Sequence, residues 1–136
     1  VCRADNDLAV KARVAWADLA GRRICLLTPD MQNRRIINQN FMDAGVAPEA
    51  QVESNSTLVL SAHVREGDWL TILPSDMAEV LTEGANLCTR PMEGQTATHA
   101  VGLVAPYREP HTPVLAALIA EAERLGEGGE TVASRR

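Results

Sequence analysis

The sequence contains no apolar run close to the roughly 20 residues that a membrane-spanning helix requires. Its first residues, VCRADNDLAV, are too polar for the apolar core of a secretory signal. They also lack an initiator methionine, so we expect the chain to be an internal piece of a longer protein. These absences predict no membrane partner and favour a cytoplasmic location.

Cysteine is scarce and irregularly placed. The three residues Cys2, Cys25 and Cys88 are an odd number, lie far apart and form no CxxC pair. Disulfide frameworks and zinc clusters need paired cysteines at characteristic spacings. Cys25 lies within the apolar run RICLLT, where we expect a small buried hydrophobe. We therefore predict no metal site and a reducing compartment.

Positive charge is also in short supply. The 13 Lys and Arg residues are outnumbered by 18 Asp and Glu residues, which gives a net charge of −5. The chain as a whole therefore offers no electrostatic surface for nucleic acid. With 136 residues, 46% of them hydrophobic and 23% charged, it has the composition of one globular domain.

Motifs of known catalytic sites are missing. The sequence has no Walker loop, no GxGxxG and no GxSxG. His63, His99 and His111 form no pair at metal-ligand spacing, and the carboxylates form no acid–base pair by spacing. We interpret Arg34 and Arg35 as a solvated helix face rather than a phosphate site. The sequence thus predicts neither an enzyme nor a cofactor.

Short apolar runs alternate with helical segments along the chain. Strands are predicted at residues 23–28, 51–54, 69–73, 86–90 and 100–105, and helices at 32–44, 57–66, 75–82 and 113–125. Residues 5–22 look polar, with one helical turn at 16–19, and residues 91–98 are expected to form a loop. Such alternation indicates an α/β fold with a mostly parallel sheet flanked by helices.

The apolar positions of two helices give expectations about burial. Leu58 and Val59 belong to a helix that is apolar on more than one side, which predicts extensive burial. In the helix after it, Met77, Val80 and Leu81 are expected on the inner side.

Three stretches, in this order, resemble the effector-binding domain of LysR-type transcriptional regulators. They are ADNDLA followed by VAWADLAGRRICLL, then VESNSTLVLSAHVREGDWLTILP, then VGLVAPYREPHTPVLAALIAEA. No single motif is highly specific; the ordered set carries the resemblance. The family's turn often holds two glycines, whereas this chain has Gly67, Asp68 and Trp69, a difference that bears on which effector fits.

The resemblance implies a fold like that of type II periplasmic binding proteins, with two α/β subdomains joined by two crossing strands. Residues 1–104 would form the second subdomain with the crossing strands at 1–4 and 100–105, and residues 105–125 would close the first subdomain. Residues 126–136 would be a disordered tail. The resemblance also implies a small-molecule effector and a homo-oligomer, with the exposed side of residues 32–44 contributing to pairing. DNA would be contacted only through a helix-turn-helix domain absent from this chain.

Ligands of open α/β sheets bind beyond the carboxyl ends of the strands, where helix N-termini offer free N–H groups. Three such ends are predicted: Thr28, Pro29, Asp30 and Met31; Ser54, Asn55 and Ser56; and Pro74. Short hydroxyl and amide side chains there suit a small carboxylate. The same residue types also cap helices, which is the simpler interpretation of Ser75 and Asp76.

Acidic residues near these ends keep the charge of the ligand open. Asp30, Glu53 and Asp76 would repel an anion unless they point away, so a cationic or zwitterionic effector is an alternative. Two other functions also remain open, a periplasmic-type solute-binding protein with the same fold and a small α/β enzyme. We predict an effector-sensing domain.

Overall fold

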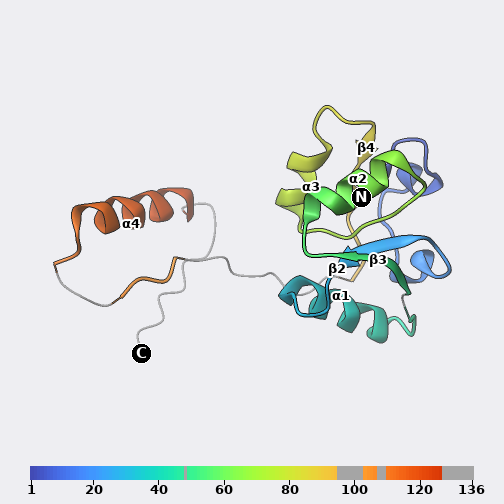
Figure 1. Ribbon diagram of the computed structural model, residues 1–136, viewed down its shortest axis with the longest axis horizontal. Helices are drawn as coiled ribbons and strands as arrows, with labels where there is room; N and C mark the ends of the chain where they lie inside the picture. The colour runs from blue at the N-terminus through green and yellow to red at the C-terminus, as the bar shows by residue number, and fades with distance from the viewer. Residues whose placement is uncertain (48, 95–102, 107–109, 127–136) are drawn as a thin grey trace. The chain divides into compact units, whose positions relative to one another are not determined.

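The computed structural model describes residues 1–47, 49–94, 103–106 and 110–126 (Figure 1). The chain divides into two compact units, Val1–Thr96 and Ala97–Arg136, which we describe separately. In the first unit strands and helices alternate, which confirms the predicted α/β class.

The four predicted helices and the strands predicted at 23–28 and 51–54 lie within a few residues of their observed positions. The first unit contains β1 (Cys2–Arg3), η1 (Asp7–Val10), η2 (Trp16–Leu19), β2 (Ile24–Leu27), α1 (Gln32–Asp43), β3 (Ala50–Ser54), α2 (Thr57–Glu66), α3 (Ser75–Thr82) and β4 (Leu87–Cys88), where η marks a 3-10 turn. The second unit contains α4 (Pro113–Gly126).

Strand β2 lies at the centre of the first unit. It pairs in parallel with β3. On its other side Leu70 forms a parallel bridge with Ile24, and the Cys25 amide donates to the Leu70 carbonyl at 2.9 Å. The predicted strand at 69–73 is thus reduced to this bridge, while both neighbours of β2 run parallel to it.

The other pair of strands runs the opposite way. β1 and β4 are antiparallel, with Cys2 opposite Cys88 and Arg3 opposite Leu87. The prediction of a mostly parallel sheet is therefore only partly right, because two-residue strands are too short for the sequence pattern to reveal their direction. The strand predicted at 100–105 lies partly outside the described residues, and its described part, residues 103–105, is not a strand.

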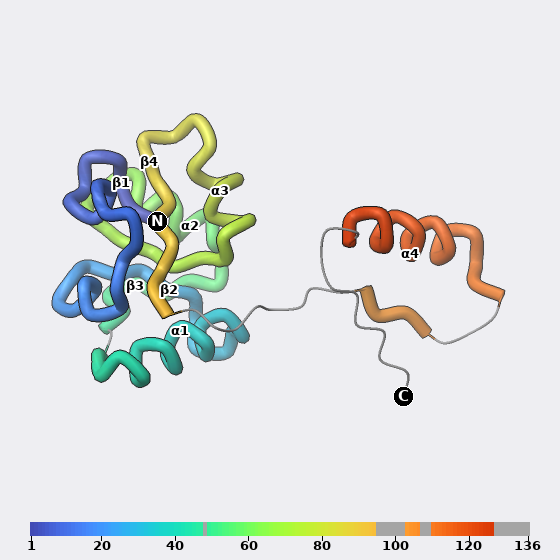
Figure 2. Tube along the Cα trace, turned by 180° about the vertical axis from the view of Figure 1, so that it is seen from behind, coloured from blue at the N-terminus to red at the C-terminus, as the bar shows by residue number. Residues whose placement is uncertain are grey.

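Burial of β2 on both faces explains its continuous apolar run. Ile24 and Leu26 belong to one core cluster with Ile37 and Phe41 of α1, whereas Cys25 and Leu27 belong to another with Leu60 and Val64 of α2. Figures 1 and 2 show α1 and α2 on opposite faces of the β2–β3 pair. The core is therefore built in three layers, helix on strands on helix.

Two burial predictions were wrong. Leu58 and Val59 of α2 are 68% and 42% exposed, and Met77 and Val80 of α3 are 39% and 72% exposed. Each helix turns only one face to the rest of the unit, so apolar residues outside that face stay in solvent. In α3 the buried position is taken by Ala78 instead.

The segment before β2 contributes more to the core than its polar composition suggested. Leu8, Val14, Trp16 and Leu19 are buried in the cluster that includes Phe41. The Trp16 indole N–H donates to the Glu93 carbonyl at 2.9 Å. Its ring meets Phe41 edge-on at 4.9 Å between centroids. The helical turn predicted at 16–19 is present as η2.

Helix α4 of the second unit begins at Pro113 as predicted. None of its residues is buried, and Val114, Leu118 and Leu125 are largely exposed. No helix within the described ranges has the length and apolarity needed to cross a membrane. The predicted tail lies, apart from Gly126, outside the described residues.

Candidate functional site

Two of the three predicted strand ends lie side by side. β2 and β3 are parallel and in a register that sets Leu27 opposite Ser54. Thr28 and Asn55, the next residues along, therefore leave the sheet at the same edge. The segment through Leu70 also runs parallel to β2, so the chain heads toward this edge before Pro74. We call the carboxyl ends of β2 and β3, with Pro74, the carboxyl edge.

A tight turn follows β2. The Met31 amide donates to the Thr28 carbonyl at 3.0 Å, which leaves Pro29 and Asp30 exposed. The Thr28 hydroxyl beside Asp30 holds the pKa of that carboxyl below its ordinary value. This hydroxyl is buried, and no described atom meets it at standard hydrogen-bond geometry. The turn thus exposes the carboxylate of Asp30 and buries the hydroxyl of Thr28.

The turn after β3 is held by a side chain. The Ser54 hydroxyl accepts a hydrogen bond from the Ser56 amide at 3.1 Å, which fixes the path of the chain into α2. Asn55 lies between them with its side chain exposed. Of the three polar residues predicted here, Ser54 has a local structural role and Asn55 faces solvent.

The helices that follow the carboxyl edge begin without side-chain caps. Met31, Ser56 and Pro74 occupy the cap positions of α1, α2 and α3, and none makes a side-chain cap hydrogen bond in the described structure. Ser75 and Asp76 lie inside the first turn of α3, so their interpretation as caps was wrong. Uncapped N-termini leave N–H donors and the positive end of the helix dipole available to an anion.

Arg34 corrects a prediction made from its charge. It is buried, and its Nη1 donates to the Leu27 carbonyl at 2.6 Å and to the Glu53 carboxylate at 2.8 Å. Its Nε donates to the Asn38 side chain at 2.8 Å. Arg35 is exposed, as expected. The signal was present in the spacing, because residues 34, 37 and 41 share the buried face of α1.

This ion pair changes the electrostatics of the carboxyl edge. Glu53 was one of the carboxylates expected to oppose an anionic ligand, and Arg34 now compensates its charge. Arg35 contributes positive potential at Asp30 and helps to lower the pKa of its carboxyl, although the Thr28 hydroxyl has the larger effect. The two arginines offset Glu53 and Asp30, whereas Asp76 in the first turn of α3 leaves one negative charge beside Pro74.

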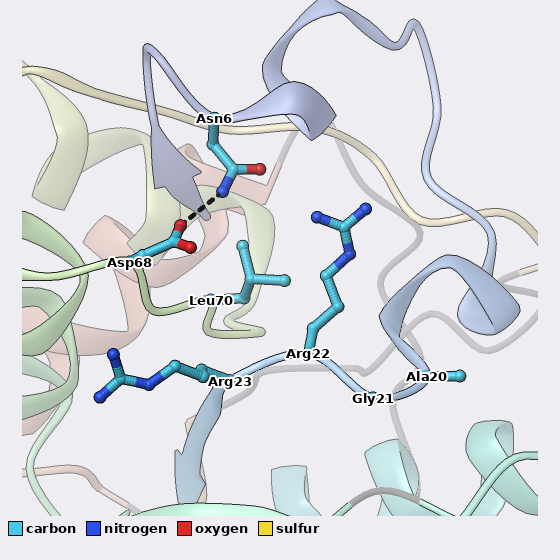
Figure 3. Close-up of a pocket in the computed structure, with 7 residues that line it drawn as sticks. All are labelled: Asn6, Ala20, Gly21, Arg22, Arg23, Asp68 and Leu70. Atoms are coloured by element: carbon cyan, nitrogen blue, oxygen red, sulfur yellow. Dashed lines mark hydrogen bonds between the residues drawn. The ribbon is translucent and has the colours of Figure 1, made fainter.

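A separate pocket of about 350 Å³ lies at the opposite edge, before β2 and before Leu70 (Figure 3). It is lined by Asn6, Ala20, Gly21, Arg22, Arg23, Asp68 and Leu70. The Asn6 amide donates to the Asp68 carboxylate at 3.0 Å. Arg22 forms a bidentate pair with Asp7, and Arg23 lies 4.0 Å over the Trp69 ring. The sequence does not predict this pocket, because its walls come from segments with no common motif.

The histidines and acidic residues of the described ranges form no group of three or more that could hold a metal ion. His63 bonds through Nδ1 to the Val59 carbonyl at 2.8 Å and packs edge-on against Trp69. This agrees with its interpretation as a packed residue. His99 lies outside the described residues, and His111 is exposed.

Comparison with known families decides the identity of the domain. The family model described as the LysR substrate binding domain matches residues 1–126. The chain belongs to this family. A probable nitrogen assimilation transcriptional activator of Synechococcus elongatus is 27% identical over 109 residues, which cover 80% of this chain and 35% of that protein. The LysR-family regulator HinK of Pseudomonas aeruginosa aligns in structure with a TM-score of 0.47 and 19% identity, over 54% of this chain and 26% of that one.

The LysR assignment confirms the resemblance carried by the three ordered stretches of sequence. The chain is thus a LysR substrate binding domain that is similar to part of a probable transcriptional activator. The chain spans about a third, 35%, of the length of the Synechococcus protein.

Proposed function

We propose that this LysR substrate-binding domain senses a small-molecule effector between two subdomains arranged as in type II periplasmic binding proteins. Residues 1–104 form the second subdomain with the crossing strands, residues 105–125 close the first, and the tail follows from residue 126. Membership of the family supports this arrangement, as does the α/β order of the first unit.

The effector that suits the carboxyl edge best is a small carboxylate. It would contact Thr28, Pro29, Asp30 and Met31 after β2, Ser54, Asn55 and Ser56 after β3, and Pro74. The observation that carries this proposal is the parallel register of Leu27 with Ser54, which gathers two of these groups at one edge. The uncapped starts of α1, α2 and α3 add N–H donors for the anion.

Effector binding would act on DNA indirectly. A ligand that favours one degree of closure between the subdomains shifts the population toward that state. In a homo-oligomer this shift alters the arrangement of the subunits. DNA would be held by a helix-turn-helix domain outside this chain, which fits the chain's net charge of −5. The protein would act in the cytoplasm.

Thermal melting of the full-length regulator against small carboxylates, amino acids and aromatic acids tests this function. We expect a saturable rise in Tm with one class of carboxylate, because a ligand that binds only the folded state stabilises it. Asn55→Ala should reduce the rise, whereas Gln39→Ala, an exposed change on α1, should not. A rise with cationic compounds alone would contradict the carboxylate proposal, and no rise with any compound would count against a small-molecule sensor.

A further inference from the structure

Two cysteines face each other across the antiparallel pair formed by β1 and β4. Cys2 and Cys88 are direct register partners, although 86 positions separate them in the sequence. Their Sγ atoms lie 3.4 Å apart, and both residues are free thiols. The sequence alone predicts no pairing among the three cysteines, because none shares a CxxC spacing.

The backbone already satisfies what a disulfide needs. Directly opposed residues of antiparallel strands have Cα atoms roughly 4.5–5.5 Å apart, within the range that a disulfide spans. The Ala4 amide also donates to the Asn86 carbonyl at 3.1 Å, so the pairing continues beyond the two cysteines. The 3.4 Å between the sulfur atoms and the direct register of the pair therefore suit a disulfide.

The two thiols differ in how an oxidant reaches them. Cys2 is buried, and the pKa of its thiol is raised to about 12, first by burial and then by its hydrogen bond with Cys88. Cys88 is only half-buried. A small oxidant therefore meets Cys88 first, and Cys2 is placed to react with the product. Cys25, fully buried between β2 and α2, lies in the other core cluster and has no thiol partner among the described residues.

We propose that Cys2 and Cys88 form a reversible disulfide that fastens β1 to β4 when the protein meets hydrogen peroxide. The sulfur of Cys88 attacks the peroxide, the O–O bond breaks, and Cys88 becomes a sulfenic acid as one water is released. The sulfur of Cys2 then attacks that of Cys88, the S–O bond breaks, and the hydroxyl leaves as a second water with the proton of Cys2. Two thiols thus lose two electrons and two protons, and one hydrogen peroxide is reduced to two waters.

The bond would close a long loop. It joins residues 86 positions apart, so it removes much of the freedom of the unfolded chain. β1 precedes every other element of the first unit, and β4 is the last strand of that unit. Oxidation would therefore join β1 covalently to β4, and reduction would free the two strands from each other.

Peptide mapping of the full chain tests the proposal. The protein is treated with hydrogen peroxide or with dithiothreitol, alkylated, digested and analysed without reduction by mass spectrometry. We expect one cross-linked species that joins the peptides of Cys2 and Cys88, lighter by about 2 Da than the two reduced peptides together. Cys25 should remain a thiol. Over-oxidised Cys88 beside reduced Cys2, or links to Cys25 or between chains, would overturn the proposal.

A melting experiment supplies the functional readout. The oxidised protein should melt higher than the reduced protein by roughly 10 °C, and dithiothreitol should reverse the rise. Cys25→Ser is the matched control and should keep both the link and the rise, whereas Cys88→Ser should lose both. An oxidised wild-type protein that carries the link but melts no higher would contradict the fastening role. These outcomes are independent of any effector, so they do not depend on the proposed function.

Discussion

The guanidinium of Arg34 joins α1, β2 and β3 at the carboxyl edge. It reaches the carbonyl that ends β2 and a carboxylate on β3 while its own helix supplies Asn38. The carbonyl at the end of β2 thereby gains a charged donor. A charged residue thus acts here as a structural clamp beside the proposed ligand site.

Replacing Arg34 with alanine should lower the free energy of unfolding by about 2 kcal/mol, because the hydrogen bonds that this buried charged donor makes to Leu27 and Glu53 are lost. The half-exposed Glu53 keeps the loss below that of a fully buried pair. Urea denaturation measures the change. Arg35→Ala, one residue away and exposed, is the control and should stay within about 0.5 kcal/mol of wild type. An equal loss of unfolding free energy in both variants would show that the buried contacts of Arg34 do not stabilise the fold.

Two consecutive residues of α1, Phe41 and Met42, lie on opposite sides of the helix, one in the core and one at the surface. Phe41 is fully buried against Trp16, whereas Met42 is 71% exposed. Phe41→Ala should cost about 4 kcal/mol, since it removes a large apolar side chain and leaves a cavity. Met42→Ala should cost less than about 0.5 kcal/mol. Chemical denaturation of the two variants checks the orientation of the helix, and comparable costs would mean that it is rotated.

At the scale of single elements, the 3-10 turn η2 depends on Asp18. Its carboxylate pairs with Lys11 at 2.6 Å and accepts the Ala15 amide at 2.9 Å. The Lys11 contact, followed by the Ala15 amide, lowers the pKa of the Asp18 carboxyl from its ordinary 3.8. The stabilisation that follows is present above pH 3.8 and is lost as the pH falls through the lower folded pKa.

The pH dependence of Asp18→Asn tests this linkage. At neutral pH the variant should melt below the wild type, because it lacks the charge that pairs with Lys11. The gap should narrow as the pH falls below 3.8 and close once Asp18 is protonated. Lys11→Met should show the same narrowing. A gap that stays constant down to pH 2 would mean that the carboxylate charge does not stabilise η2.

The sequence predicted best those elements whose pattern is local. β2 is a continuous apolar run between polar ends, and α1 and α2 carry helical spacing and end at glycine, so their positions were correct within a few residues. β1 and β4 contain only two residues each and pair across most of the unit, so neither their partner nor their direction was readable. The prediction of burial was wrong where only one face of an apolar helix contacts the core, as at Val80.

The candidate site was predictable only in outline. The rule that parallel strands share a carboxyl edge correctly brought Thr28 and Asn55 together. It did not reveal that Arg34 compensates Glu53, because this contact depends on how α1 docks on the strands. The pocket at the opposite edge was missed for the same reason, since Asn6 and Asp68 meet only after folding.

At the scale of the whole molecule, the first unit should fold without the second. Both core clusters are made of residues between Val1 and Met92. A fragment of residues 1–96 should therefore keep a cooperative transition with a Tm close to that of the full chain, because α4 contributes no buried residue. Circular dichroism on heating measures this. A fragment that melts gradually, without a transition, would show that the second unit completes the fold.

We propose that a small carboxylate binds at the carboxyl edge rather than in the opposite pocket. Hydrogen exchange of the full-length regulator, with and without the carboxylate that raises its Tm, tests this most directly. We expect slower exchange of backbone amides in residues 28–34 and 54–58, with little change around residues 20–23 and 68. Slower exchange confined to the segments around Arg22 and Asp68, with the carboxyl edge unchanged, would contradict it.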